Sequence, residues 1–266
     1  MPNQLVIKCG GSMLSELPDS FYEDIVEIKS SGTDPVIVHG GGPAISNIVA
    51  KMGLQSQFID GLRVTDEETL QVAQMVLIGQ INKEIVCRIQ QAGGRAAGIS
   101  GIDGPTVEVI QGPEYLGFVG EVRNVDPLLI RTLSAAGYIP VLAPLGVDST
   151  GQVYNVNADT TAGAVAGVLG VKQLIMVTDV PGVMQETDGV KRVLPELGPG
   201  QIENLIEEGV IYGGMIPKVK AALDALGQEV EEVLIINGYE PGILRQVAAG
   251  EPVGTKIVAE GKVANK

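Results

Sequence analysis

Lysines and glycines stand where apolar strand-like segments end, and such groups can hold a transferring phosphoryl group. Lys8 closes an apolar segment directly before Gly10 and Gly11. A cation held beside free backbone N–H groups stabilises the negative charge of a phosphoryl group in flight. The alternative is an edge lysine whose ammonium group extends to solvent, and Lys8 alone does not separate the two.

A second glycine-rich segment, HGGGPAI at residues 39–45, follows another apolar stretch. Gly40–Gly42 let the backbone approach an anion, and Pro43 suits the first turn of a helix whose positive end faces that anion. A simple tight turn needs one glycine rather than three. His39, the single histidine of the chain, is a candidate base. Its place at the end of an apolar strand favours a structural hydrogen-bonding role instead.

Arg63 lies amid apolar and turn residues in DGLRVTD, residues 60–66. An arginine there either clamps a carboxylate with two hydrogen bonds or forms a surface ion pair with Asp60 or Asp66.

Two later segments place polar groups at the start of predicted helices. YNVNADTTAG at 154–163 offers two amides and a carboxylate, although Asn157 or Asp159 is equally a candidate helix N-cap. GGMIPKVKAALDA at 213–225 carries Lys218 in the first turns of a helix, where a phosphate would bind. The alternative is an ordinary amphipathic helix with solvated lysines.

Several common sites are excluded by their motifs. The chain has no G-x-x-x-x-G-K-[ST] P-loop, and GGRAAG at 93–98 follows a predicted helix, so it reads as a helix stop rather than a dinucleotide fingerprint. Two cysteines and one histidine do not make a usual zinc site. We therefore expect any metal to arrive with a nucleotide.

Short β-branched runs alternate with helical stretches, which is typical of a mainly parallel sheet covered by helices on both faces. The strands are expected at residues 5–8, 36–39, 139–143, 174–178 and 233–236. Ligands of such α/β sheets bind beyond the carboxyl ends of the strands, which is where the glycines stand.

A long helix is predicted from Asp66 to about Ala92, with Thr65 and Glu68 at capping-box spacing. The segment is apolar almost all round between residues 72 and 81, so one face can cover the sheet while another meets a second subunit. The alternative is a helix wholly buried in one chain. Gly79 in its middle predicts close backbone packing.

The formal charge of −14 disfavours binding to nucleic acid and to anionic membranes. No signal-peptide pattern precedes the first strand, and no apolar stretch approaches the length of a membrane-spanning helix. Cys9 and Cys87 lie in apolar surroundings and are expected to be buried, reduced thiols. These features predict a cytoplasmic protein. A boundary near residue 170 would divide one continuous sheet into two lobes.

Together and in this order, these segments resemble the amino-acid kinase family along nearly the whole chain. DGLRVTD, YNVNAD and GGMIPK resemble its branch that acts on N-acetyl-L-glutamate. The resemblance implies a three-layer αβα sandwich, with residues 1–170 binding the amino acid and forming a homodimer and residues 171–266 binding ATP. It implies transfer of phosphate from ATP, with Mg²⁺ carried by the nucleotide and no metal site in the protein, to the γ-carboxylate of N-acetyl-L-glutamate, an early step of arginine biosynthesis.

The same resemblance implies roles for individual residues. Lys8 and Lys218 would stabilise the phosphoryl group, with the catalytic Asp159 between them. The N–H groups of Gly41 and Gly42 would meet the reacting carboxylate. Substrate binding at the other end would use Arg63 and Asn155, with Asn157 as a neighbouring candidate. The implied nucleotide-binding residues are Gly10, Gly11, Thr178, Asp179, Gly182, Gly213, Gly214 and Met215.

Two departures from the branch qualify the resemblance. Asp60 stands where asparagine is common, so we leave it out of the site. The first strand begins near Gln4 and GYEPGILRQ stands near the C-terminus, which favours a homodimer over an arginine-inhibited hexamer. Two alternatives stay open: a sister kinase acting on a carrier-linked aminoadipate or glutamate, and a non-catalytic sensor. The presence of Lys8, Asp159 and Lys218 together argues against a sensor.

Overall fold

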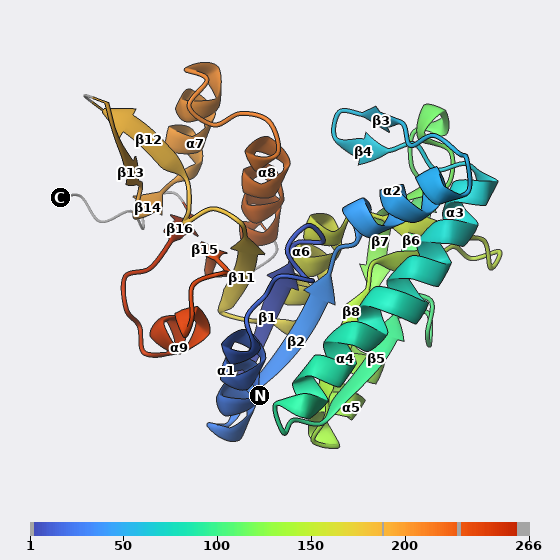
Figure 1. Ribbon diagram of the computed structural model, residues 1–266, viewed down its shortest axis with the longest axis horizontal. Helices are drawn as coiled ribbons and strands as arrows, with labels where there is room; N and C mark the ends of the chain where they lie inside the picture. Colours follow the sequence, from blue (N-terminus) through green and yellow to red (C-terminus); the bar gives the residue numbers. More distant parts are fainter. Residues whose placement is uncertain (1–2, 188, 228–229, 260–266) are drawn as a thin grey trace.

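A computed structural model describes residues 3–187, 189–227 and 230–259, and it places a mostly parallel sheet between two layers of helices (Figure 1). Neighbouring strands are parallel except for the antiparallel pair β15 and β16. All five expected strands are present, so the predicted α/β fold is confirmed. In spatial order the sheet consists of β14 (Glu196–Leu197), β16 (Thr255–Val258), β15 (Glu232–Asn237), β11 (Gln173–Thr178), β1 (Asn3–Cys9), β2 (Thr33–His39), β8 (Ile139–Ala143) and β5 (Ala96–Ser100).

Alternation along the central strand creates two separate cores. Val6 of β1 packs into a core that includes residues of α6 and α8, whereas its neighbour Ile7 packs into a core that includes residues of α1 and α4. Successive strand side chains point to opposite faces, so a continuous apolar strand requires helices on both sides. The helices are α1 (Asp19–Ser30), α2 (Gly42–Lys51), α3 (Glu67–Gln74), α4 (Asn82–Gln91), α5 (Leu128–Ala135), α6 (Ala158–Leu169), α7 (Pro199–Glu207), α8 (Met215–Leu226) and α9 (Ile243–Ala248).

Among the described residues, three smaller sheets accompany the large one. A closed four-stranded barrel consists of β6 (Val107–Gln111), β7 (Val119–Val125), β9 (Leu145–Val147) and β10 (Val153–Val156), and a 3₁₀ turn, η2 (Glu114–Leu116), precedes β7. Two hairpins consist of β3 (Phe58–Ile59) with β4 (Leu62–Arg63) and β12 (Met184–Thr187) with β13 (Val190–Val193).

The predicted long helix is one helical run, but the predictions made for Thr65, Gly79 and Cys87 are wrong. The N-cap is Asp66, whose Oδ1 accepts a hydrogen bond from Thr69 N at 2.8 Å, while the Thr65 hydroxyl donates to Arg63 O. The middle of the run, η1 (Met75–Ile81), is a π-helix. A Cβ at Gly79 would meet no described atom within 4 Å, so the described residues show no close backbone packing there. Cys87 on α4 is exposed rather than buried.

The chain crosses from one half of the sheet to the other without a break. β11, which begins just past residue 170, pairs directly with β1 over four residue pairs. The carboxyl ends of β1, β2 and β11 therefore meet at one edge of the sheet, in the middle of the molecule (Figure 1). No helix in the described ranges is long and apolar enough to cross a membrane.

Candidate active site

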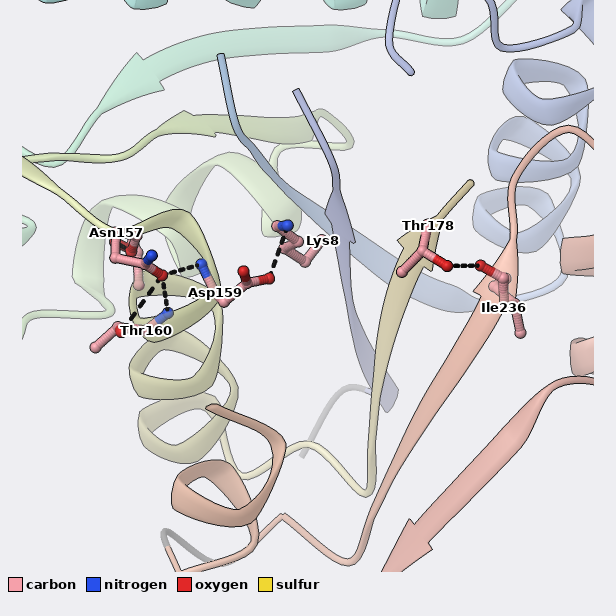
Figure 2. Close-up of polar contacts among 7 residues, drawn as sticks. Lys8, Asn157, Asp159, Thr160, Thr178 and Ile236 are labelled. Atoms are coloured by element: carbon pink, nitrogen blue, oxygen red, sulfur yellow. Dashed lines mark hydrogen bonds and ion pairs between the residues drawn. The ribbon is translucent and has the colours of Figure 1, made fainter. Parts of the chain in front are cut away.

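Lys8 and Asp159 form a buried ion pair beside the carboxyl end of β1. The Lys8 Nζ lies 2.7 Å from Asp159 Oδ1, and Figure 2 shows the two side chains pointing at one another from β1 and from the start of α6. Asn157 is the N-cap of α6, because its Oδ1 accepts hydrogen bonds from Asp159 N and Thr160 N at 2.8 and 3.0 Å. The cap thus fixes the first turn of the helix that carries Asp159.

Lys218 completes the charged cluster from the first turns of α8. Burial opposes ionisation of Asp159, but the positive charges of Lys8 and Lys218 outweigh it and hold the Asp159 pKa below its ordinary value. Burial and the like charge of Lys8 lower the pKa of Lys218, and the opposing charges of Asp159 and Asp179 restrain the shift. Lys8, Lys218 and Asp159 together carry one net positive charge, which suits an incoming anion, while Asp179 adds a negative charge within electrostatic range of Lys218.

The glycine turns after β1 and β2 pack backbone against backbone. A Cβ at Gly11 would lie 2.4 Å from Gly41 N, and a Cβ at Gly41 would lie 2.5 Å from the Leu77 side chain. Larger residues would force the two turns apart. In the described part of the chain, neither Gly11 N nor Gly41 N donates to a backbone acceptor. Gly42 is the first residue of α2, so its N–H also lies at a helix N-terminus where anions bind.

Arg63 is held in place by neutral acceptors. Its guanidinium donates to Ser56 Oγ, Gly42 O and Ser46 Oγ, each at 2.7 Å, and stacks on Phe58. Among the described residues it has no ion pair, so the alternative of a surface pair with Asp60 or Asp66 is wrong. Burial lowers the pKa of Arg63. A buried guanidinium without a counter-ion is suited to bind a carboxylate.

A pocket of about 190 Å³ joins the predicted acceptor-site residues. Asn155 lies at its wall and donates from Nδ2 to Thr65 Oγ1 at 3.3 Å. Asp60 is not among the lining residues. It occupies the exposed turn of the β3–β4 hairpin with φ of 50°. The lining residues that the sequence had singled out are Gly11, Gly40, Gly41, Gly42, Arg63, Asn155, Asn157 and Asp159.

The predicted nucleotide-binding residues are more scattered. Asp179 is exposed after β11, and Gly213 and Gly214 are exposed before Met215, the first residue of α8. A Cβ at Gly213 or at Gly214 would meet no described atom within 4 Å, so space around this turn is open.

Three other predicted residues serve the fold where they stand. The Thr178 hydroxyl donates to the Val180 and Ile236 carbonyl oxygens; Figure 2 shows the contact with Ile236. Gly10 N donates to Val177 O at 3.3 Å, and a Cβ at Gly182 would lie 2.5 Å from Thr255 Oγ1. Their role in binding a nucleotide stays a prediction.

His39 has the structural role expected of it. It is fully buried, with Nδ1 3.0 Å from Gly40 O and Nε2 3.3 Å from Asn82 Nδ2. Burial lowers its pKa to about 4, although the hydrogen bond to Gly40 opposes the shift. The ring is therefore neutral near pH 7, with its proton on Nδ1 donated to Gly40 O.

Sequence reasoning missed several residues that shape the pocket. Ser46 follows the glycines by one turn of α2, and Ser56 and Phe58 lie in the polar segment before Arg63. Only Asn82 could have been noticed from the sequence, because it is a polar residue directly after the apolar run that ends at Ile81. Serines and phenylalanines scattered in this way carry no motif, so their convergence depends on the fold.

Two lysines around a buried aspartate, beside glycine turns at the carboxyl ends of central strands, define a phosphotransferase of the α/β class that lacks a P-loop. The chain belongs to the amino acid kinase family, whose model matches residues 3–237. The predicted resemblance is thereby confirmed.

Named relatives match over nearly the full chain. The acetylglutamate kinase of Brevibacillus brevis (strain 47) is 50% identical over 259 residues, covering 97% of each chain. That of Methanothrix thermoacetophila is 43% identical over 264 residues, covering 95% of this chain and 91% of the relative. A crystal structure of smu.665 from Streptococcus mutans UA159 superposes with a TM-score of 0.85 at 30% identity, covering 97% of this chain and 99% of that one.

Proposed function

We infer that the protein transfers the γ-phosphoryl group of ATP to the γ-carboxylate of N-acetyl-L-glutamate, which gives N-acetyl-L-glutamyl 5-phosphate and ADP in arginine biosynthesis. Relatives named acetylglutamate kinase, 47–50% identical to this chain, cover 97% of it. The observation that carries the inference is the Lys8–Asp159 pair, with Lys218 in electrostatic reach, at the wall of a pocket. That pocket is also lined by Arg63, which is buried and forms no ion pair with any described residue.

The proposed reaction needs no general base. An ionised carboxylate is already a nucleophile at neutral pH, so its oxygen forms a bond to the γ-phosphorus while the bond to the bridging oxygen breaks and ADP leaves. The site must bring two anions together and hold them in line. We assign that task to Lys8 and Lys218, with Asp159 holding the Lys8 ammonium group in place. His39, neutral and buried, takes no part in proton transfer.

In the proposed arrangement the substrate carboxylates occupy opposite ends of the pocket. The reacting γ-carboxylate would accept hydrogen bonds from Gly41 and Gly42, and the α-carboxylate would bind the guanidinium of Arg63 and the amide of Asn155. ATP would bind over Asp179 and the turn before α8. These assignments divide the chain into an acceptor lobe, residues 1–170, and a nucleotide lobe, residues 171–266.

The donor set fits a metal that arrives with the nucleotide. Within the described ranges, no three His, Cys, Asp or Glu side chains converge on one point, and Asp159 is engaged by Lys8. Mg²⁺ commonly keeps several waters and binds substrate phosphates rather than an all-protein cage. We therefore propose that Mg²⁺ is bound through the ATP phosphates, where it would neutralise charge on the β- and γ-phosphoryl groups.

We also propose a cytoplasmic homodimer built on the α3–η1–α4 run. Met75 is 58% exposed on this run, and the space around Gly79 is open, so one turn of the helix can receive a second copy. Light scattering after gel filtration tests the proposal. Gly79→Arg should give the monomer mass while the exposed Glu67→Arg on the same run keeps the dimer; a monomeric wild-type chain would refute it.

Hydroxylamine trapping tests the proposed reaction, because it converts acyl phosphates to coloured hydroxamates. The acceptors compared are N-acetyl-L-glutamate, L-glutamate, L-aspartate and α-aminoadipate, each with MgATP. Hydroxamate should form with N-acetyl-L-glutamate and not with the other three. Folded, ATP-binding protein that gives no hydroxamate with any of them would point to a carrier-linked acceptor or a sensor.

A further inference from the structure

A buried amide links three strands of the sheet beneath the glycine turn of the pocket. Asn82, the first residue of α4, is fully buried, and its Nδ2 lies 2.8 Å from Val141 O, 3.2 Å from Ile99 O and 3.3 Å from His39 Nε2. These acceptors come from the adjacent strands β8, β5 and β2. Val141 O and Ile99 O can only accept, so the NH₂ group must face them and the Asn82 side chain has one orientation. The two amide hydrogens are shared among these oxygens and His39 Nε2.

The surroundings of Asn82 are shaped to admit it. Its Oδ1 accepts from Lys83 Nζ at 3.0 Å, so both ends of the amide have partners. A Cβ at Gly98 would lie 1.8 Å from Asn82 Oδ1, which means that any other residue at position 98 would displace the amide. Asn82 directly follows the π-helical segment η1, and π-turns frequently accompany functional sites.

The contact continues from Asn82 to the pocket through His39. Because Asn82 donates to Nε2, the ring carries its proton on Nδ1 and donates it to Gly40 O. A planar trans peptide points its N–H opposite to its C=O, so holding Gly40 O also fixes the direction of Gly41 N–H. Gly41 lines the pocket, and its N–H has no backbone acceptor in the described part of the chain.

We propose that Asn82 is a positioning residue for the acceptor site: through His39 it fixes the Gly40–Gly41 peptide and aims Gly41 N–H at the substrate carboxylate. The proposal rests on the proposed function, since it assumes an acceptor carboxylate at Gly41. Leu77 and Ile81 of η1 press on Gly41 from the same helical run, because a Cβ there would lie 2.5 and 2.7 Å from their side chains. The helical run thus fixes the glycine turn in two ways, by the polar contact of Asn82 with His39 and by the apolar packing of Leu77 and Ile81 against Gly41.

The first arm of the test reads the histidine directly. The chain has a single histidine, so ¹⁵N spectra of protein made without a histidine tag report on His39 alone. Wild type should show a protonated Nδ1 and an unprotonated Nε2. Asn82→Asp places a carboxylate against Nε2, so Nε2 should become protonated and the Gly41 amide resonance should shift. A protonated Nε2 in wild type would overturn the proposal.

The second arm reads catalysis with a control on the same helix. Asn82→Leu, which keeps the volume and removes the amide, should lower kcat on the order of 10–100-fold, while the KM for ATP stays within about twofold. Arg88→Met removes contacts to Leu17 and Asp19, away from the glycine turn, and should leave kcat near wild type. Equal kcat in Asn82→Leu and wild type would overturn the proposal.

The two arms separate failure of this proposal from failure of the proposed function. If wild type forms no hydroxamate with any acceptor, the proposed function fails, and the His39 tautomer together with the Gly41 shift still decides whether Asn82 holds the turn. If Asn82→Leu does not fold, Asn82→Asp serves in both arms, since it keeps the size of the side chain. In that case its kcat should fall by the same range, and an unchanged kcat would refute the positioning role.

Discussion

The two halves of the proposed site, one for the acceptor and one for the nucleotide, differ in how much of their structure is already in place. In the acceptor region, Arg63 has hydrogen-bond partners on Gly42, Ser46 and Ser56 and is 7% exposed. In the proposed nucleotide region, Asp179, Gly213 and Gly214 are exposed, and the turn before α8 has open space around it. The fold already orders the groups of the proposed acceptor half, whereas the groups of the proposed nucleotide half would be ordered by the bound ligand.

This difference indicates where selectivity arises. Groups that are already ordered need no further loss of conformational entropy on binding, and they cannot adapt to a ligand of another shape. A buried polar site also leaves its own groups unpaired when the wrong substrate enters, which gives strong discrimination. We therefore expect narrow selectivity for the acceptor and more tolerance for the nucleotide base.

The largest effect is expected from Lys8, whose positive charge lies between the two halves. Lys8→Met should lower kcat by about 10³-fold, because it removes a cation from the phosphoryl group in flight and leaves Asp159 without its partner. The hydroxamate assay measures kcat, and a thermal melt checks folding. Lys172→Met removes an exposed lysine that precedes β11, at the opposite end of the strand, and should stay within about twofold of wild type. Similar losses in both variants would contradict a specific role for Lys8.

A smaller effect should be confined to the acceptor half. Arg63→Lys should raise the KM for N-acetyl-L-glutamate roughly 10–100-fold and leave the KM for ATP nearly unchanged, because an ammonium group cannot reproduce the planar fork of a guanidinium. Steady-state kinetics with each substrate varied in turn measure the split. The surface variant Arg123→Lys is the matched control. An equal rise in both KM values would remove the distinction between the two halves.

The pH dependence of kcat should report the nucleotide half through Lys218. Burial and the charge of Lys8 lower the pKa of Lys218 below its ordinary 10.5. As pH rises, Lys218 therefore loses its proton at a lower pH than an ordinary lysine and can no longer stabilise the phosphoryl group. The alkaline decline of kcat should therefore begin below that value in wild type. In Lys218→Arg the decline should move to higher pH, because a guanidinium stays charged. The pH dependence of kcat is measured by chromatography of the ADP formed. A decline at the same pH in wild type and Lys218→Arg would mean that another group causes it.

The smallest effect should fall outside both halves. Arg245 on α9 pairs at 2.8 Å with Asp24, which is buried on α1. Arg245→Ala should lower the free energy of unfolding by about 1–2 kcal/mol with both KM values unchanged, because the arginine is half-exposed. Thermal melts measure the loss, and Arg245→Lys should recover part of it.

The sign of the pH dependence provides a second check on that pair. Burial raises the pKa of Asp24 in the folded state despite the opposing charge of Arg245. A carboxyl group whose folded pKa lies above its unfolded pKa favours folding as it becomes protonated. The deficit of Arg245→Ala should therefore shrink as pH falls through the folded pKa of Asp24. A deficit that grows on acidification would contradict the assignment.

Local signals in the sequence determined the strands and their glycine turns. Apolar β-branched runs that end in Lys8 and His39, each followed by glycines, identify strand ends because short continuous apolar runs bounded by tight turns leave few alternatives. The same local reasoning failed at Thr65, which the capping-box spacing predicted as the N-cap. The N-cap is Asp66, whose side chain accepts a hydrogen bond from Thr69 N. The reasoning also failed at Gly79, since a lone glycine does not tell a close contact from an open surface.

The tertiary structure decided everything that depends on distant segments meeting. Arg63 is buried without a counter-ion among the described residues because the β3–β4 hairpin folds against the start of α2. Asn82 reaches His39 across 43 positions of sequence because of the order of strands β2, β8 and β5 and the π-helical segment before α4. The spacing of apolar residues does not predict such contacts, because each residue would fit its own helix or strand equally well in many folds. Packing alone fixes which buried donor faces which acceptor, and so fixes the aim of the groups that line the pocket.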